Sequence, residues 1–332
     1  MEIINLPKSL NRECLYYSVI PKIYSKINKN DYEFCFDMSN SELSNAEFLV
    51  GMLSAASLIR NKYNHISKLQ LPNSSSRLFN YLENINFFSI ASMPYNNVLN
   101  FIKYSKKSIK REYKGYTSKI SCITTISDIL THQNNATKIT YDFLQKLMNE
   151  EKKDGHWNFY KLFELSLIQL IENFFEHNIY EISYDCSAYY IAQKMPYDVI
   201  QIVFYDTGKG FRKRIIEIIK KEKESIEKGT PPITDFNLYM KLEKELNNNA
   251  LLWNKTKNNP NLLAIKAALD FRNNSLIPGL AVIKDFALSK GGSFFVHSAN
   301  SSVEFDKSGN EKYEFYNENF SGVHFCIEIP LK

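Results

Sequence analysis

The stretch FELSLIQLIENFFEHN, from Phe163 to Asn178, decides how the rest of the chain is interpreted. Its apolar residues recur at three- and four-residue steps and cover most of the circumference, which predicts a buried helix. A narrow polar stripe runs down one helical face and consists of Ser166, Gln169, Asn173, Glu176 and His177. Because buried polar groups cost free energy unless they are satisfied, the stripe faces either solvent or a polar ligand.

Two later stretches carry the turn residues of a ligand site. VIQIVFYDTGKGF, from Val199 to Phe211, predicts a strand that ends at an aspartate and is followed by a glycine turn. PGLAVIKDFALSKGG, from Pro278 to Gly292, predicts a helix that ends at paired glycines. Two predicted strands follow it, SFFVHSA and GVHFCIEIP. A polar helix stripe, a glycine turn and a glycine-flanked helix therefore occur in this order.

These stretches resemble the GHKL superfamily of gyrase, histidine kinases and MutL, whose ATP-binding domain is called the Bergerat fold. ENFFEHN is similar to its asparagine box, DTGKG to its first glycine box, and PGLAVIKDF with SKGG to its second glycine box. The resemblance covers about residues 158 to 330, half of the chain. It implies an α/β sandwich that binds ATP and Mg²⁺.

The resemblance assigns a role to each box. Asn173 would give its amide oxygen to Mg²⁺ beside the triphosphate, and Asp206 would accept a hydrogen bond from the adenine amino group. Gly208 and Gly210 would take positive φ and let the backbone approach the ligand. A plain turn aspartate is the alternative for Asp206. The full set of expected nucleotide contacts is Asn173, His177, Asp206, Gly208, Lys209, Gly210, Gly279 and Leu280.

Two departures from the family pattern limit what the resemblance implies. Hydrolytic members carry a glutamate base where this chain has Gln169, and an amide cannot take a proton, so ATP binding is expected without hydrolysis. Ile277 replaces a glycine of the second box, before the helix N-terminus at Gly279 that would face phosphate. For His177, a local hydrogen bond at the helix end is favoured over a catalytic role.

The stretch between the glycine boxes, Arg212 to Ile277, corresponds to the family's ATP lid. RKRIIEIIKKEKESIEK predicts a helix whose apolar side contains Ile215, Ile216, Ile218 and Ile219. AIKAALDFRNN then leads into the second box. The candidate phosphate contacts in and beside this stretch are Lys209, Arg212, Lys213 and Lys266. For each of them, the alternative is a side chain that is simply exposed to solvent.

The first 135 residues predict a separate α/β layer. Strands are expected at Asp31–Phe36 and Ile66–Leu71, and Ser44 or Asn45 can cap a helix AEFLVGMLSAASLIRNKY. A second helix is expected over RLFNYLENINFF, residues 77–88. The stretch resembles a STAS-like domain, the fold of anti-sigma-factor antagonists, in which a serine of a DSxG turn is phosphorylated. Here the turn reads LSNA, so a capping role for Ser44 is favoured over phosphorylation.

A basic segment, Lys103 to Lys119, follows this layer with seven Lys or Arg residues and one Glu. Such a segment can bind a phosphate backbone, but a solvated face or connector between domains is the favoured interpretation. Residues Thr124 to Asp154 are expected to be a helical connection. The organisation predicted is a STAS-like domain over residues 1–135 and a Bergerat domain over residues 136–332.

Composition is consistent with two globular domains in a chain of 332 residues, of which 44% are hydrophobic and 23% charged. The five cysteines are scattered without a CxxC pair, which favours reduced core thiols and a cytoplasmic location. Neither a signal peptide nor a membrane span is expected. The net charge of +5 does not by itself favour a nucleic-acid partner.

The expected function is an ATP-dependent switch, or a serine/threonine protein kinase of the anti-sigma type, that acts through a protein partner. No phosphoacceptor His-Glu pair of a histidine kinase stands upstream, which leaves the anti-sigma kinases as the better resemblance. Homodimer formation stays open. One alternative is a nucleotide-sensing binding protein without phosphotransfer, and another is a nucleic-acid-associated ATPase that uses Lys103–Lys119.

Overall fold

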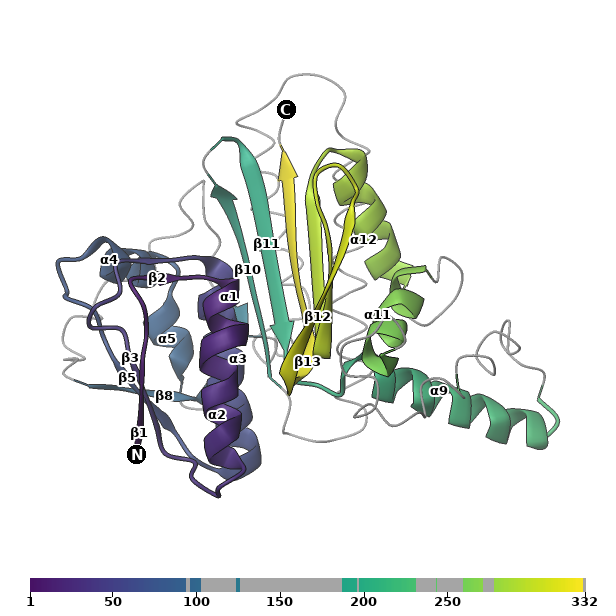
Figure 1. The fold of residues 1–332 in the computed structure, drawn as a ribbon, viewed down its shortest axis with the longest axis horizontal. Coiled ribbons are helices and arrows are strands. Elements are labelled where there is room, and N and C mark those ends of the chain that lie inside the picture. Colours follow the sequence, from purple (N-terminus) through teal and green to yellow (C-terminus); the bar gives the residue numbers. More distant parts are fainter. Residues whose placement is uncertain are drawn as a thin grey trace. The chain divides into compact units, whose positions relative to one another are not determined.

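The computed structural model describes residues 1–93, 96–102, 124–125, 187–195, 197–230, 243, 259–270 and 278–330. The chain divides into two compact units. Unit 1 comprises Met1–Trp157, Tyr184–Thr207 and Leu331–Lys332, and unit 2 comprises Asn158–Ser183 and Gly208–Pro330. A parallel sheet and separate antiparallel strands occur among helices, so the fold is a mixed α/β fold of the α+β type (Figure 1).

Unit 1 contains a parallel sheet with strand order β1-β3-β5-β8. Its strands are β1 Glu2–Asn5, β3 Phe34–Asp37, β5 Ser67–Gln70 and β8 Leu99–Ile102. Parallel neighbours need crossover connections, and helices lie in each of them. These helices are α1 Arg12–Cys14, the π-helix η1 Leu15–Val19, α2 Ile20–Ile27, α3 Ala46–Tyr63, α4 Arg77–Asn84 and α5 Phe87–Ala91. Two short pairs add β2 Ser9–Leu10 with β4 Leu43–Ser44, and β6 Ser92–Met93 with β7 Asn96–Asn97.

One face of the parallel sheet forms a core of unit 1. The register aligns Ile4 with Phe36, Phe36 with Leu69 and Leu69 with Phe101, so these side chains share a face. Ile4, Phe36 and Leu69 are buried. Ile3 and Lys68, one residue away in their strands, are exposed on the other face. This alternation fixes the register because a slip by one residue would expose the apolar set.

Helix α3 of unit 1 is buried over most of its length. It packs against β5 and also against two antiparallel strands of the same unit, β10 Ala188–Met195 and β11 Val199–Asp206. A Cβ atom added at Gly51 would lie 2.2 Å from Cδ2 of Leu15 and 2.9 Å from Cε2 of Tyr205. Because the helix is apolar nearly all round, it can pack against neighbours on opposite sides.

Polar side chains join this helical layer to β10 and β11. The hydroxyl groups of Ser57 and Tyr189 share a hydrogen bond. The Tyr81 hydroxyl on α4 donates to Oε1 of Gln193 at 2.9 Å, and Nε2 of Gln193 donates to Oε1 of Gln201 at 2.7 Å. These bonds satisfy polar groups that burial would otherwise penalise. At the other side of β10, the strand β9 Thr124–Thr125 pairs with Tyr189 and Tyr190.

Within the described residues, unit 2 contains a long antiparallel hairpin and three helices. Its elements are α9 Gly210–Glu227, α11 Pro260–Asp270, α12 Pro278–Ser289, β12 Ser293–Phe305 and β13 Glu311–Pro330. Helices α11 and α12 pack along β12, as Figure 1 shows in green beside the yellow hairpin. The core of this unit contains Leu262, Ile265, Ile283, Phe294 and Val296, all fully or almost fully buried.

Most of the predicted elements within the described residues are confirmed. Helices α3, α9 and α12 and strand β11 have the expected extents, and α9 buries Ile215 and Ile219 while Ile216 and Ile218 are half-buried. The strand expected at Asp31–Phe36 is observed at Phe34–Asp37. Cys14, Cys35 and Cys326 are buried thiols, and burial raises the pKa of Cys14 and Cys35.

Two of the expected secondary-structure elements are wrong. The single helix predicted over residues 77–88 is divided into α4 and α5, because Asn86 adopts φ of +60° and ends the first helical segment. Thr124–Thr125 form a strand rather than part of a helical connection, because they complete the hydrogen bonding of the edge of β10. The remainder of that connection and the basic segment 103–119 lie outside the described residues.

Candidate functional site

Strand β11 holds Asp206 at its carboxyl end. Every side chain from Ile200 to Asp206 is buried, and Asp206 itself is 5% exposed. The strand pairs with β10 in an unbroken antiparallel register whose terminal pair is Ala188 with Asp206. A buried carboxylate at a strand end is costly unless hydrogen-bond donors or a polar ligand satisfy it. Asp206 is thus a buried acidic residue at the point where β11 ends.

The residue after Asp206 closes the end of the strand pair. The Thr207 N–H donates to the Ser187 carbonyl oxygen at 2.9 Å, and the Ser187 N–H donates to Oγ1 of Thr207 at the same distance. Asn61, in the last turn of α3, donates from Nδ2 to Oγ of Ser187 at 3.2 Å. Thr207 is buried, so its side chain fastens the backbone beside Asp206 rather than facing solvent.

The glycine turn after Thr207 starts a helix. Gly210 has φ of +73°, as predicted, whereas Gly208 is not in the positive-φ region and that expectation is wrong. A Cβ atom at Gly210 would lie 2.6 Å from Oγ of Ser298 and 3.2 Å from the carbonyl oxygen of Gly322. Gly210 is therefore required by its backbone conformation and by the close approach of its neighbours.

Ser298 satisfies the first turn of α9. Lys209 is the N-cap residue of this helix, but its side chain makes no capping hydrogen bond. The Phe211 N–H instead donates to Oγ of Ser298 at 3.2 Å, and Ser298 donates to the Gly322 carbonyl at 3.1 Å. A register shift next to Ser298, with Ala299 at φ of +60°, accompanies this arrangement. Part of the glycine box is thus held by β12 and β13 of the same unit.

The candidate phosphate contacts have other partners. Nζ of Lys209 forms an ion pair with Oε1 of Glu217 at 2.9 Å. Lys266 donates to the Tyr313 hydroxyl at 2.8 Å and lies 4.1 Å from the centre of that ring. Arg212 is half-buried, and burial lowers the pKa of its guanidinium, while Lys213 is exposed. A phosphate would have to compete with these contacts at Lys209 and Lys266.

Helix α12 begins at Pro278, as the sequence predicts, with Gly279 in its first turn. Leu280 is fully buried among the apolar residues of unit 2, so its side chain packs in the core. At the other end, the N–H groups of Gly291 and Gly292 donate to Leu288 and Ala287 carbonyls, each at 2.9 Å. The glycines of SKGG therefore end the helix and lead into β12.

The remaining predicted site residues lie outside the described residues. These are Gln169 at the expected base position, the metal ligand Asn173, His177 and Ile277. In the part of the chain that the structure describes, no three His, Cys, Asp or Glu side chains gather as metal ligands.

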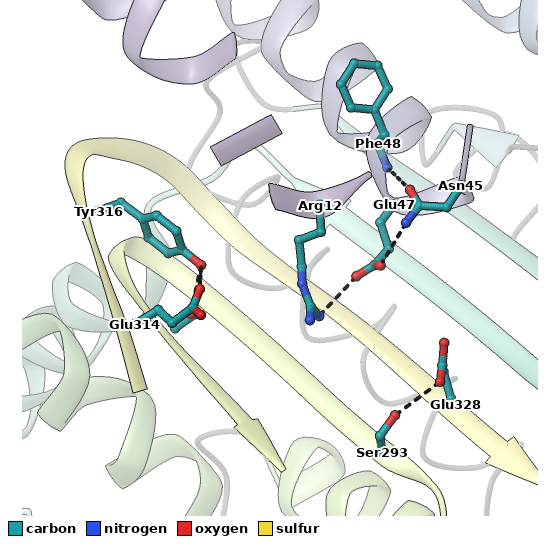
Figure 2. Close-up of polar contacts among 9 residues, drawn as sticks. Arg12, Asn45, Glu47, Phe48, Ser293, Glu314, Tyr316 and Glu328 are labelled. Atoms are coloured by element: carbon teal, nitrogen blue, oxygen red, sulfur yellow. Dashed lines mark hydrogen bonds and ion pairs between the residues drawn. The ribbon is translucent and has the colours of Figure 1, made fainter. Parts of the chain in front are cut away.

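A second polar cluster surrounds the N-terminus of α3. Figure 2 shows Arg12 and Asn45 directed at the carboxylate of Glu47, with the Phe48 N–H directed at Asn45. Nη1 of Arg12 lies 3.3 Å from Oε1 of Glu47, which is buried, and Oδ1 of Asn45 accepts from the Phe48 N–H at 2.9 Å. Asn45 is thus the N-cap, and a capping role for Ser44 is wrong, because the Ser44 hydroxyl donates to the Asn45 carbonyl.

Unit 2 also contains an aromatic and histidine cluster within the hairpin. The rings of His297 and His324 stack at 4.9 Å with an angle of 14°, and both side chains are fully buried. Tyr316 packs edge-on against His297 at 5.3 Å. Burial lowers the pKa of His297 well below its ordinary value, and the nearby His324 lowers it further to a smaller extent. In the same hairpin, Figure 2 shows the contacts of Tyr316 with Glu314 and of Ser293 with Glu328.

Sequence reasoning missed Asn61, Ser187 and Ser298. Each is a common polar residue with a distant partner. Asn61 bonds to Ser187 across 126 positions, and Ser298 bonds to Phe211 across 87 positions. No local pattern could have identified them, since their roles arise only when the strands are paired.

No family model, no curated protein and no solved structure matches the chain. Within the described ranges, no helix is both long enough and apolar enough to cross a membrane.

Proposed function

We propose that the protein is an ATP-binding regulatory protein of the GHKL type, in which a STAS-like N-terminal domain is joined to a Bergerat nucleotide-binding domain. It acts as an ATP-dependent switch on a protein partner. The observation that carries the proposal is the buried Asp206 at the end of β11, followed by Gly210 at φ of +73° where α9 begins. This combination joins a carboxylate suited to an amino group with a backbone turn that only glycine fits.

Three further features support the proposal. The helix-initiating sequence Pro278–Gly279 opens α12, whose first-turn N–H groups are suited to phosphate. The parallel sheet of unit 1, with helices in its crossovers, agrees with a STAS-like layer in general architecture. In the sequence, Asn173 stands in an asparagine box that supplies an oxygen ligand for Mg²⁺.

The proposed switch has two alternative forms. In the first, the protein transfers phosphate from ATP to a serine or threonine of a partner. Gln169 at the base position argues against hydrolysis, because an amide cannot accept the proton of an attacking water. A nucleotide sensor without phosphotransfer is the second form. Gln169 agrees with the sensor as well as with the kinase, because neither needs a base for hydrolysis. Labelled ATP incubated with candidate partners separates them, since only the kinase form yields a labelled protein.

Calorimetric titration of the full chain with ATP, ADP and GTP tests the binding site. ATP and ADP are expected to bind in the presence of Mg²⁺, and GTP much more weakly, because Asp206 would face a carbonyl instead of an amine. Asp206→Asn should weaken ATP binding roughly tenfold or more, since a charged hydrogen bond contributes about 1.5–3 kcal/mol. The control is Asp285→Asn, which removes a charge from a half-exposed position on α12. Equal affinities for ATP and GTP would overturn the adenine assignment.

Phosphate release tests the role of Gln169. Turnover of ATP by the isolated protein should stay near background, and Gln169→Glu should raise it, since a general base typically contributes about 10²–10⁴-fold in rate. Robust wild-type hydrolysis that Gln169→Ala leaves unchanged would show that another residue acts as the base.

A further inference from the structure

Helix α3 is connected by hydrogen bonds to the strand end that carries Asp206. The connection runs from Nδ2 of Asn61 to Oγ of Ser187, and from the Ser187 N–H to Oγ1 of Thr207 at 2.9 Å. Oγ1 of Thr207 also donates to the Ser187 carbonyl at 3.3 Å. All four residues belong to unit 1, and Thr207 is covalently bonded to Asp206.

These contacts lie one step beyond the last pair of the strand ladder. Ala188 and Asp206 are the terminal partners of β10 and β11, so the next residues, Ser187 and Thr207, determine whether the end of the ladder frays. The backbone bond from the Thr207 N–H to the Ser187 carbonyl is reinforced by the Thr207 hydroxyl, which both donates and accepts there. Strand ends without such bonds are the parts of a sheet that open most easily.

The connection belongs to an element with little freedom to move. Between Asn45 and Asn61, α3 rises about 24 Å at 1.5 Å per residue, and most of its side chains are buried. Gly51 contacts Tyr205 on β11 so closely that any larger side chain would collide with it. Packing at Gly51 against Tyr205 of β11 and the hydrogen bond from Asn61 to Ser187, just before β10, therefore fix α3 against this strand pair at two separate points.

We infer that α3 sets the affinity and adenine selectivity of the candidate nucleotide site, with Asn61 and Thr207 as positioning residues that hold the Asp206 carboxylate through Ser187. The inference rests on the proposed function. Its physical basis is that a carboxylate selects an amine over a carbonyl only while its position is fixed. A strand end that can fray orders on binding, and that ordering reduces the affinity for the nucleotide.

The test compares variants of the full chain by calorimetry with Mg-ATP and Mg-GTP. Asn61→Ala removes the donor to Ser187, and Thr207→Val keeps the side-chain shape but removes the hydroxyl. Each should weaken ATP binding about three- to tenfold, the effect of one lost hydrogen bond, and should lower the ratio of ATP to GTP affinity. Thr207→Ser retains the hydroxyl and should restore the ratio. The control on the same helix is Ser54→Ala, because the Ser54 hydroxyl donates only to Val50 of α3 itself.

Thermal unfolding of each variant separates positioning from loss of structure. Asn61 is half-buried at the end of α3, so its alanine variant should unfold within a few degrees of the wild type. If the wild type binds ATP and both Asn61→Ala and Thr207→Val retain its affinity and selectivity, the inference is overturned while the proposed function stands. If the wild type binds neither nucleotide, the proposed function falls and this inference falls with it.

Discussion

The two long antiparallel strand pairs differ in regularity. The pair β10–β11 keeps one register over all of its partners, from Ala188 with Asp206 to Met195 with Val199. The pair β12–β13 shifts register on both sides of Ala299. The first pair packs against α3, where Gly51 lies close to Tyr205. The second pair uses its irregularity to present Ser298 to the first turn of α9.

The difference separates two ways of holding a site residue. Asp206 is held by regular pairing, with hydrogen bonds that close the end of the ladder. Gly210 is held by an irregular strand, where one hydroxyl accepts from the Phe211 N–H and donates to the Gly322 carbonyl. Regular pairing distributes stability over many contacts, whereas the bulged region concentrates it in a few. Single substitutions should therefore have larger effects near Ser298 than near β10.

Gly210→Ala gives the largest expected effect. The variant would place a Cβ atom 2.6 Å from Ser298 Oγ at φ of +73°, so it combines backbone strain with displacement of a hydroxyl that makes two hydrogen bonds. The expected loss is about 2–4 kcal/mol in the free energy of unfolding, measured by urea denaturation. Gly229→Ala is the matched control, because Gly229 has φ of +82° and open space around it, and should lose only about 1 kcal/mol. Equal losses at the two positions would show that the contact with Ser298 contributes nothing.

Ser298→Ala tests the bulged pair directly. The substitution leaves the Phe211 N–H and the Gly322 carbonyl without their partner in a buried region, which should cost about 1–3 kcal/mol. Hydrogen exchange at the Phe211 amide should become faster. Ser289→Ala is the control, since the Ser289 hydroxyl bonds only to Phe286 at an exposed helix end and should change stability by less than about 0.5 kcal/mol. Unchanged exchange at Phe211 would contradict the capping role of Ser298.

The same contrast explains what could be predicted from the sequence. Strand β11 and its end at Asp206 were predictable because a β-branched and aromatic run stops at an Asp-Thr-Gly turn. The start of α12 at Pro278 followed from the preference of proline for the first helical position. Both signals are local, so neighbouring residues are sufficient to determine them.

Features that depend on distant partners could not be predicted. Ser298 is 87 residues from Phe211, and its role exists only because the strand register shifts beside it. The break between α4 and α5 depends on Asn86 in the left-handed region, a conformation that asparagine tolerates but does not require. The strand end at Asp206 and the positive φ of Gly210 were therefore predictable, but the distant residues that contact them were not.

The buried histidine pair makes the hairpin of unit 2 sensitive to acid. Burial, and secondly His324, lowers the pKa of His297 below its ordinary value of 6.5, so the unfolded chain binds a proton that the folded chain excludes. Stability should fall as the pH decreases below about 6.5, by about 1.4 kcal/mol for each pH unit until the folded pKa is reached. Urea denaturation between pH 7.5 and 5.5 measures this loss. His297→Phe should reduce the slope, and an identical slope in the variant would show that another group is responsible.

Tyr81 should give the regular pair the opposite pH dependence. Its hydroxyl donates to Gln193 at 2.9 Å, and burial raises the pKa of Tyr81 to about 12. Above its ordinary value of 10, the unfolded chain releases a proton that the folded chain retains, so stability should fall as the pH rises from 10 to 12. Tyr81→Phe should cost about 0.5–1.5 kcal/mol at pH 7, where the hydrogen bond is lost and titration plays no part. At pH 11 the difference between the variant and the wild type should narrow, because only the wild type has lost stability through this group.

Tyr32→Phe is the control, since the Tyr32 hydroxyl bonds to Asn30 at the surface. A constant difference between Tyr81→Phe and wild type across this pH range would show that the Tyr81 hydroxyl is open to solvent, and that β10 is less firmly attached to α4 than its regular pairing implies.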